Sequence, residues 1–555
     1  MSNITSRERS VRLGLGLLAA TLICAGCARG EPHDGAIGCE RRALRPTDAD
    51  AGDMFRYAAE EIVESLALDG GTVRVHFTRV GPNALADGGD EYPGLVARRY
   101  ESLLATAEQV WGYPRALSDE GLASSGGDGR FDVYLLDFGG RSDGAFRIDT
   151  CLDAGEGGGA GPASSRCIGY VVQENDFAGY GYPSLDEAVT VLASHEYFHA
   201  IQSALDGDQS APISEGSAVW ATERYAAGTG DFERFLPAFL AEPSRPLDLA
   251  PAGPASSSIY GTALFFQFLE ERHGAEVIRD AWVHCQDGHG YATEPSDQAN
   301  PRFLIQLDAA LRERDAGFAQ AFTDFALWNL LLGPGAVPDA GYREAAGYPV
   351  QAVEDRDLPV EEPALRVYYA SVRALRVGLG DRRRLEVALG GEGGLGAAPE
   401  EVRAVLAFRA ADGRTLGQSA LAAAGGVSEV PAGATHAVVA LVNGARSPRG
   451  PVIASRPSVC LGSEVEVAAC LHPDAGTEDP MLAPTGLGCT GTGGAASTAS
   501  LALALVLGRR LISTQRVSCQ YADWTRHRAQ SPRHLQREAR LPEAQTNLPQ
   551  EDAFG

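Results

Sequence analysis

Apolar residues follow two different periods in the first part of the chain. They recur at three- and four-residue intervals over 53–68 and 92–111, which predicts two helices. Three other runs, at 72–80, 131–138 and 167–173, are rich in Val, Ile, Tyr and Phe and are bounded by Gly, Asp or Asn, which is typical of strands. This mixture predicts a sheet packed against helices, and therefore an α+β fold.

The period changes again after Gly333-Pro334-Gly335. Before this break, apolar spacing predicts helices over 301–312 and 318–332. After it the period is two, and Asp412-Gly413 and Asn443-Gly444 supply turn residues. We therefore expect a small all-β sandwich built from 367–377, 385–389, 402–408 and 437–442.

The segment that begins at Ser184 predicts one long, buried helix. Ser184 and Glu187 form a capping-box pattern directly after Pro183. From 188 to 205 there is no Gly or Pro, and nearly every turn carries Val, Leu, Phe or Ile. A helix that is apolar on almost every side is buried in its domain.

This helix contains His195-Glu196-Tyr197-Phe198-His199, an H-E-x-x-H pattern. His195 and His199 are one turn apart and share a face, so two imidazole nitrogens can bind one metal ion. Buried imidazoles without a partner destabilise a fold, and metal ligation supplies that partner. Glu196 lies beside the open coordination position, where a carboxylate acts as general base. The pattern predicts a zinc peptidase site with Glu196 as a catalytic residue.

A third ligand is expected from the helix that follows Pro212. The chain between His199 and Glu215 is long enough to return to the metal. Glu223 lies about 12 Å further along the same helix, so both carboxylates cannot easily bind one ion. We predict that Glu215 is the third ligand. We predict that Glu223 does not touch the metal but hydrogen-bonds one of the residues that do. A solvated position beside Arg224 is the alternative for Glu223.

The H-E-x-x-H pattern followed by Ser214-Glu215-Gly216-Ser217-Ala218 resembles the gluzincin metallopeptidases, with a somewhat shorter gap than in the best-known members. A closer similarity, carried by 170–176, 195–202 and 260–266, is to a family of predicted myxobacterial cell-surface metalloproteases. The resemblance implies a zinc peptidase with the ligands named above.

In gluzincin aminopeptidases, a tyrosine that opens a Gly-containing helix hydrogen-bonds the oxyanion. The matching residue here is Tyr260, for which the resemblance implies a catalytic role. A half-buried structural tyrosine is the alternative reading of Tyr260, and Tyr225 and His284 are rival candidates for the role.

Both ends of the chain carry sorting-type sequences. Basic residues precede a short apolar run over 13–23, which is the layout of a secretory signal, and Ala25-Gly26-Cys27 resembles a lipobox in which Cys27 becomes lipidated. Cys24 stands where a lipobox usually has Leu, so simple cleavage near Ala28 is the alternative. Residues 488–510 resemble the MYXO-CTERM sorting signal, and 511–555 are predicted to be a disordered or mis-framed tail. The predicted organisation is a signal segment (1–27), a tether (28–50), a metallopeptidase domain (51–335), a β-sandwich accessory domain (336–460), a linker (461–487), the sorting signal (488–510) and the tail (511–555).

Charge and cysteine content agree with export. The formal net charge of −26 repels phosphate backbones and anionic lipid, so nucleic acid is not an expected partner and membrane contact is expected only through the terminal signals. An even number of cysteines between the end segments favours disulfides: Cys151 with Cys167 and Cys460 with Cys470 by nearness, and Cys39 with Cys285 by elimination.

Together these features predict a secreted or surface-anchored zinc peptidase that hydrolyses peptide or protein substrates. An extended substrate is expected to pair with 167–173 as an edge strand of the sheet. The alternative is a catalytically silent surface protein that uses the metallopeptidase scaffold for binding or adhesion. The intact Glu196 argues against that alternative, because metal ligation alone does not need a general base.

Overall fold

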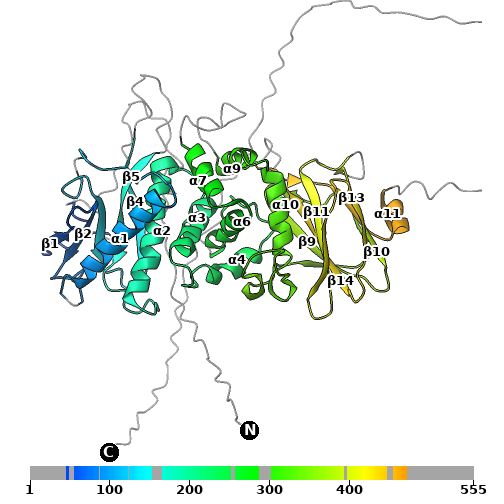
Figure 1. Ribbon diagram of the computed structural model, residues 1–555, viewed down its shortest axis with the longest axis horizontal. Coiled ribbons are helices and arrows are strands. Elements are labelled where there is room, and N and C mark those ends of the chain that lie inside the picture. Colours follow the sequence, from blue (N-terminus) through cyan, green and yellow to red (C-terminus); the bar gives the residue numbers. More distant parts are fainter. Residues whose placement is uncertain are drawn as a thin grey trace, which may run out of the picture. The chain divides into compact units, whose positions relative to one another are not determined.

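A computed structural model describes residues 45–48, 55–86, 88–122, 124–152, 166–251, 257–286, 302–392, 397–446 and 454–471 of the chain. These residues form helices and sheets in an α+β fold, as predicted (Figure 1). The predicted signal segment, the sorting signal and the tail lie outside the described residues, as do Cys27 and Cys39.

The first sheet has five strands in the order β1-β2-β3-β5-β4. The central strands β2, β3 and β5 are parallel, and β1 and β4 pair antiparallel at the two edges. The strand bounds are β1 Val63–Leu66, β2 Val73–Thr78, β3 Phe131–Leu136, β4 Gly144–Cys151 and β5 Cys167–Glu174.

Alternate residues of this sheet enter two different cores. Val75, Val133 and Val171 face the helices α1 (Glu91–Gln109) and α2 (Leu185–Asp206). Tyr134 and Tyr170 point to the opposite face and pack with other aromatic side chains. Both faces are covered, so most residues of the three central strands are buried, including polar ones such as His76 and Asp132.

Two predictions about this sheet are wrong. The helix expected over 53–68 does not form in the described residues, because Val63–Leu66 pairs with β2 as strand β1. The apolar spacing there matched a helix, but sheet pairing overrode it. The segment 167–173 is not an edge strand, because β5 lies between β3 and β4. The edge strand next to β5 is β4, a segment for which no element was predicted.

Part of the predicted tether at 28–50 is folded. Arg45 is fully buried on the outer face of the first sheet, where its guanidinium binds the carboxylates of Asp119, Asp132 and Asp149. His76 of β2 also bonds Asp132, at 2.7 Å. The prediction of a tether is therefore wrong at 45–48, because an arginine surrounded by three carboxylates anchors this segment to the sheet.

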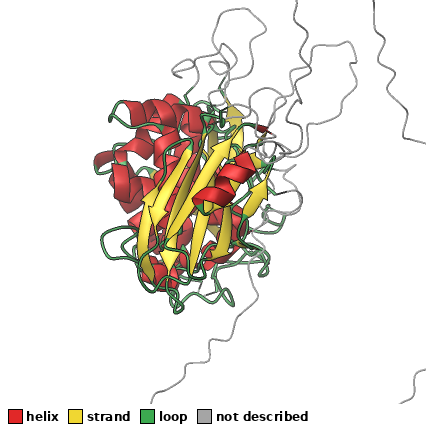
Figure 2. Ribbon diagram, turned by 90° about the vertical axis from the view of Figure 1, so that its right-hand side faces the viewer, coloured by secondary structure: helices red, strands yellow, loops and turns green. Residues whose placement is uncertain are grey.

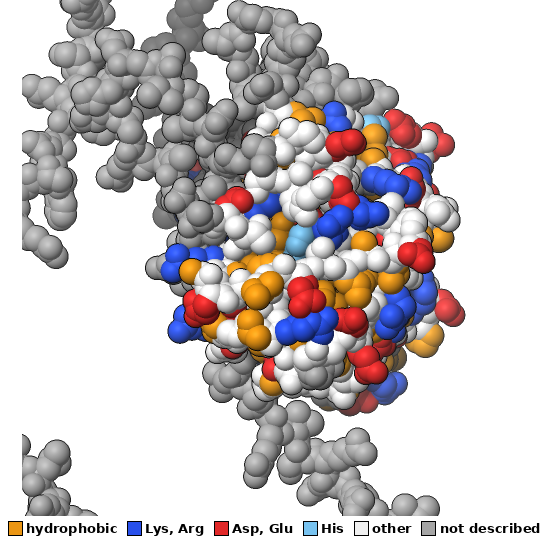
Figure 3. Space-filling model, turned by 90° about the vertical axis from the view of Figure 1, so that its left-hand side faces the viewer, with side chains coloured by type: hydrophobic (Ala, Val, Ile, Leu, Met, Phe, Trp, Pro, Cys, Tyr) orange, Lys and Arg blue, Asp and Glu red, His pale blue; other side chains and the backbone are white. Residues whose placement is uncertain are grey.

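Surface charges at the β1 and β2 end occur in pairs of opposite sign. Figure 3 shows basic and acidic side chains interspersed on this face. Arg79 binds Glu64 of β1 at 3.1 Å, and Arg74 of β2 binds Asp128. Exposed pairs of this kind each contribute at most about 1 kcal/mol, so the buried Arg45 cluster matters more for the stability of the sheet.

The helices that follow the sheet form most of the remaining core. Apolar residues of α6, α9 and α10 pack together through Phe265, Phe303 and Phe325. The bounds are α3 Ala211–Tyr225, η1 Glu233–Phe235, α4 Leu236–Leu240, α5 Ser257–Gly261, α6 Ala263–His273, α7 Glu276–His284, α9 Phe303–Arg312, α10 Phe318–Asn329, η2 Gly333–Gly335 and η3 Ala345–Gly347.

The C-terminal strands form two facing sheets, in the orders β12-β11-β14-β9-β6 and β13-β10-β16-β7, with a separate pair β15-β8. Their bounds are β6 Glu354–Arg356, β7 Val360–Glu362, β8 Val367–Tyr368, β9 Ser371–Gly378, β10 Arg384–Gly390, β11 Val402–Arg409, β12 Thr415–Ala420, β13 Gly425–Glu429, β14 His436–Asn443, β15 Ala454–Ser455 and β16 Ser458–Gly462. Figure 2 shows a helix lying against these strands, and α11 (Glu464–Leu471) packs on β16 and β10. Residues 461–471, predicted as linker, are therefore part of the fold.

The helices share a core with one face of the sandwich, and a second core lies between its two sheets. Val439 and Leu441 of β14 point between the two sheets, whereas Val438 and Ala440 join the core formed by the helices. On β11, Arg409 also donates to the backbone oxygen of Leu330 in the helical part. The described residues belong to one compact unit, so the predicted division into separate domains at 335 is not confirmed.

Two of the predicted disulfides are present. Cys151 and Cys167 are directly opposed across β4 and β5, and Cys460 of β16 is bonded to Cys470 of α11. Cys285 is buried and has no disulfide partner among the described residues. Within that same part of the chain, no helix is both long and apolar enough to span a membrane.

Candidate metal centre

Helix α2 carries the H-E-x-x-H pattern, and its start is capped as predicted. Ser184 is extended, and its hydroxyl oxygen accepts a hydrogen bond at 3.1 Å from the backbone N–H of Glu187. Most residues of α2 are buried because the helix packs on β5, β4, α1 and α3. His195 and His199 therefore project from a helix that is fixed on several sides.

The first turns of α3 bring Glu215 to the two histidines. The Nε2 atoms of His195 and His199 are 3.1 Å apart. Glu215 Oε2 lies 3.1 Å from Nε2 of His195 and 3.3 Å from Nε2 of His199. These three residues form a group able to hold a metal ion. Ligand atoms roughly 2.0–2.1 Å from a tetrahedral ion are about 3.3 Å from one another, so the three donors fit such an ion.

Burial and the neighbouring charges shift the pKa values of this group in opposite directions. The side chains of His195 and His199 are 15 % and 13 % exposed, and that of Glu215 is 2 % exposed. Burial alone lowers the pKa of His199, but the carboxylate of Glu215 outweighs burial and raises that pKa to about 9. Burial opposes ionisation of Glu215, yet the adjacent His199 and His195 hold its pKa well below the usual range. The buried carboxylate of Glu215 therefore favours positive charge beside it.

Glu196 lies beside this group and reaches the edge of the first sheet. Its Oε2 accepts a hydrogen bond at 2.5 Å from the backbone N–H of Phe146 on β4. Only 7 % of Glu196 is exposed, and burial raises the pKa of its carboxyl. The general-base candidate is thus held between the ligand helix and an edge strand, an arrangement that sequence spacing did not reveal.

Glycine at position 216 allows the close approach that places Glu215. A Cβ there would lie 2.8 Å from Thr262 Cβ and 3.0 Å from the backbone N of Ala263, so α3 packs directly on the start of α6. A larger residue would push the two helices apart. The Glu-Gly pair therefore combines a ligand with the contact that positions it.

Tyr260 is brought to the histidines by a second close contact. It lies on α5, its ring centroid is 6.1 Å from that of His195, and its ring stacks on Phe235 at 5.0 Å. At Gly261 a Cβ would lie 2.7 Å from the backbone oxygen of Phe235, so glycine permits α5 to approach η1. The rival candidate Tyr225 donates to Ser102, away from the group.

Glu223 does not join the group. Its Oε1 accepts a hydrogen bond from the backbone N–H of Gly228 at 3.2 Å, and burial raises the pKa of its carboxyl. Within the described residues, its Oε2 is buried without a hydrogen-bond partner. The expected contact from Glu223 to a ligand is not observed, because eight further residues of α3 carry it away from Glu215.

Gln202 is a functional candidate that the sequence reading missed. Its Oε1 lies 2.7 Å from Nδ1 of His199, on the side of the ring opposite the metal group. The available signal was its position three residues after His199, where a side chain shares the helix face of that histidine.

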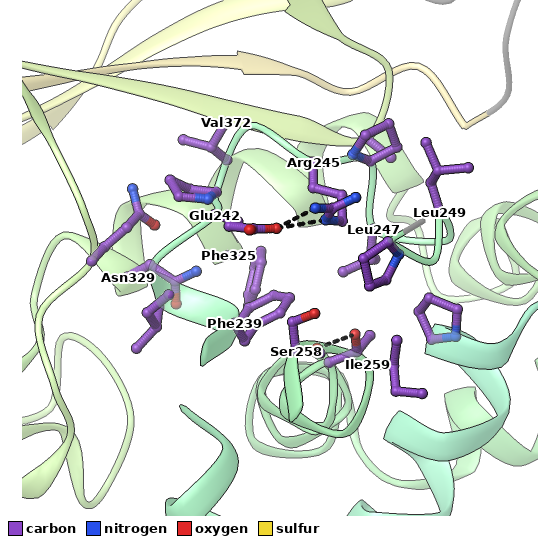
Figure 4. Close-up of a pocket in the computed structure, with 18 of the residues that line it drawn as sticks. Phe239, Glu242, Arg245, Leu247, Leu249, Ser258, Ile259, Phe325, Asn329 and Val372 are labelled. Carbon is purple, nitrogen blue, oxygen red and sulfur yellow. Dashed lines mark hydrogen bonds and ion pairs between the residues drawn. The ribbon is translucent and has the colours of Figure 1, made fainter. Parts of the chain in front are cut away.

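An apolar pocket lies on another side of α5. Figure 4 shows Phe239, Leu247, Ile259 and Phe325 around it, together with the ion pair between Glu242 and Arg245. Ile259 of α5 lines the pocket, while Tyr260, the next residue on the helix, faces His195. The pocket is therefore separate from the candidate metal centre.

No protein-family model and no curated protein matches this chain. One solved structure found by comparison is described as "A novel family GH115 4-O-Methyl-alpha-glucuronidase, BtGH115A, with specificity for decorated arabinogalactans". It is 11% identical, the match covers 63% of this chain and 53% of that one, and the TM-score is 0.11. The match thus spans about half of that protein, and so low a score carries no argument about fold or activity.

Proposed function

We propose that this protein is a zinc-dependent peptidase that acts outside the cytoplasm. The observation that carries the proposal is the convergence of His195, His199 and Glu215, with donor atoms 3.1–3.3 Å apart, beside the buried carboxylate of Glu196. Two imidazoles and one carboxylate are a ligand set typical of catalytic zinc, which keeps a further position open.

His195, His199 and Glu215 would hold the ion, which when bound supplies Lewis acidity and lowers the pKa of water. Glu196 would accept the proton of the attacking water and later deliver it to the leaving amine. Burial suits Glu196 to this work, since the raised pKa of its carboxyl brings proton uptake closer to neutral pH. The N–H of Phe146 fixes the direction of that carboxylate.

The edge strand β4 is the proposed binding surface for the peptide. It pairs with β5 on one side only, and an edge strand offers backbone groups that an extended chain can use. Because Glu196 reaches this same strand at Phe146, a peptide added to β4 would pass close to the general base. We therefore propose that β4, and not 167–173, pairs with the extended peptide substrate.

Tyr260 is proposed to orient the substrate carbonyl oxygen. Its ring lies near His195, and stacking on Phe235 limits its movement. A hydroxyl held in advance near the developing oxyanion needs little rearrangement during the reaction.

Export is proposed on the basis of the terminal sequences and the two disulfides. Disulfides persist in oxidising compartments, so Cys151–Cys167 and Cys460–Cys470 are compatible with an extracellular protein. Surface anchoring through lipidated Cys27 or through the sorting signal at 488–510 belongs to the same proposal.

The test compares zinc content and cleavage of an unstructured protein substrate for wild type and Glu196→Gln. We expect the variant to retain zinc and to lose cleavage by at least about a hundredfold, because only the proton acceptor is removed. Glu223→Gln is the matched control, since this glutamate lies outside the group, and it should cleave normally. Equal cleavage by wild type and Glu196→Gln would overturn the peptidase proposal and favour a catalytically silent binding protein.

A further inference from the structure

Helices α2 and α3 are joined by one buried amide next to the candidate metal centre. We infer that Gln202 is a positioning residue that holds His199 of α2 and Glu215 of α3 in their relative places. The inference rests on the proposed function, because it assigns Gln202 a purpose in binding the metal.

The hydrogen bonds of Gln202 fix which end of its amide faces the histidine. Its Nε2 donates to the backbone oxygen of Ser214 at 2.9 Å and to the hydroxyl oxygen of Ser217 at 2.8 Å. A backbone oxygen only accepts, and the Ser217 hydroxyl gives its proton to the backbone oxygen of Ile213 at 2.7 Å. Both partners therefore require the NH₂ group, so Oε1 faces Nδ1 of His199.

This orientation fixes the proton on His199. Gln202 Oε1 lies 2.7 Å from Nδ1 of His199, and an amide oxygen can only accept. Nδ1 must therefore carry the hydrogen, and in the neutral ring this leaves the lone pair on Nε2. Nε2 is the atom that lies 3.3 Å from Glu215, on the side where the metal would bind. Gln202 thus selects the metal-binding tautomer.

The same amide holds the turn of α3 that carries Glu215. Ser214 and Ser217, its two acceptors, flank Glu215 on that helix. The Ser214 hydroxyl also donates to Gln202 Oε1 at 3.0 Å, so this serine is bound to both ends of the amide. A shift of α3 along α2 would break these bonds together with the ligand geometry.

Burial makes the hydrogen bonds of Gln202 hard to replace. Gln202 is 3 % exposed and Ser217 is fully buried, so water cannot replace a lost partner without rearrangement. Every donor and acceptor position of the amide is used, which is the condition under which a buried polar network specifies a single geometry.

The experiment uses the full chain in metal-free form and three variants. Gln202→Leu removes every bond of the amide, and Gln202→Glu keeps an acceptor for His199 but loses the donors to Ser214 and Ser217. Gln209→Leu is the control, because Gln209 lies between the same helices but accepts from the N–H of Phe303 at 2.9 Å. Zinc affinity is measured by competition with a chromophoric chelator. The His199 tautomer is read from ¹⁵N shifts of labelled histidine at a pH where those shifts show the ring to be neutral.

We expect Gln202→Leu to weaken zinc binding by about 10–100-fold and to lose the fixed Nδ1–H form. Gln202→Glu should keep that form with a smaller loss of affinity, and Gln209→Leu should change neither. Unchanged affinity and tautomer in Gln202→Leu would overturn the inference, as would equal losses in Gln209→Leu.

The two proposals fail in different ways. Zinc binding without cleavage by the wild type would refute the peptidase and leave the role of Gln202 supported by affinity and tautomer. A wild type that binds no zinc would also refute the peptidase. The ¹⁵N shifts would then decide alone, supporting the inference if Gln202→Leu changes the tautomer and refuting it if not.

Discussion

The close contact at Gly216 allows a test of whether the packing of α3 on α6 positions Glu215. Gly216→Ala adds a Cβ at 2.8 Å from Thr262 Cβ and at 3.0 Å from the backbone N of Ala263. Carbon atoms pack at about 3.5–4.0 Å, so α3 and the start of α6 must separate by roughly half an ångström or more. Glu215 precedes Gly216 directly, and its carboxylate would move with the helix.

Two opposing effects set the expected change in the free energy of unfolding of Gly216→Ala. Alanine in place of glycine within a helix gains about 1 kcal/mol, and overpacking a core contact costs about 1–3 kcal/mol. The control is Gly94→Ala in α1, whose Cβ would meet only the end of the Arg98 side chain, at 3.2 Å. Both variants share the helix gain, so the difference between them isolates the contact and should be about 1–3 kcal/mol.

Urea unfolding of the metal-free proteins measures that difference, and chelator competition measures zinc binding. We expect Gly94→Ala to be as stable as wild type or more so, with unchanged zinc affinity. Gly216→Ala should be less stable than Gly94→Ala and should bind zinc about tenfold more weakly, because ligand distances tolerate shifts of only about 0.2 Å. The reasoning is refuted if the two variants have equal stability and equal zinc affinity.

Two further predictions concern buried charge. The pKa of His199 is raised to about 9 by Glu215, so its contribution to stability is complete below its ordinary pKa of about 6.5 and is lost as the pH rises through 9. Urea unfolding of the metal-free protein should therefore show a loss on the order of 3 kcal/mol between these pH values, and a flat profile would contradict this. Arg45→Met removes the guanidinium that neutralises the buried carboxylates of Asp119, Asp132 and Asp149, and should destabilise the protein by about 3–5 kcal/mol; a loss below about 1 kcal/mol would show that the cluster is not a buried ion network.

Local sequence was enough to predict the ligand helix and the group at its centre. Ser184 caps α2 as the pattern indicated, and the helix is buried because its apolar residues leave no polar face. His195 and His199 share a face by helix geometry alone. Glu215 was also predicted, because the chain after His199 is long enough to return to the metal and because Glu215-Gly216-Ser217-Ala218 resembles the gluzincin pattern.

The predictions were wrong or missing where pairing with a distant segment decides the secondary structure. The stretch at 63–66 has apolar spacing compatible with a helix, yet β2 recruits it as a strand. Strand β4 was not predicted, because its apolar and polar residues alternate only over the short run Phe146-Arg147-Ile148-Asp149. The order of strands in the sheet, and therefore which strand is the edge, depends on pairings between distant segments.

The sequence by itself determined the chemical groups of this protein's candidate site: two histidines and two carboxylates on two buried helices, the first of which is capped by Ser184. Only the tertiary structure decided which groups surround that chemistry. It brought Phe146 of β4 to Glu196, Gln202 to the backbone of α3, and Tyr260 to His195. The physical reason is the sequence separation of the interacting residues. Helix period and capping act over a few residues, whereas these contacts join segments that meet only when the core is packed.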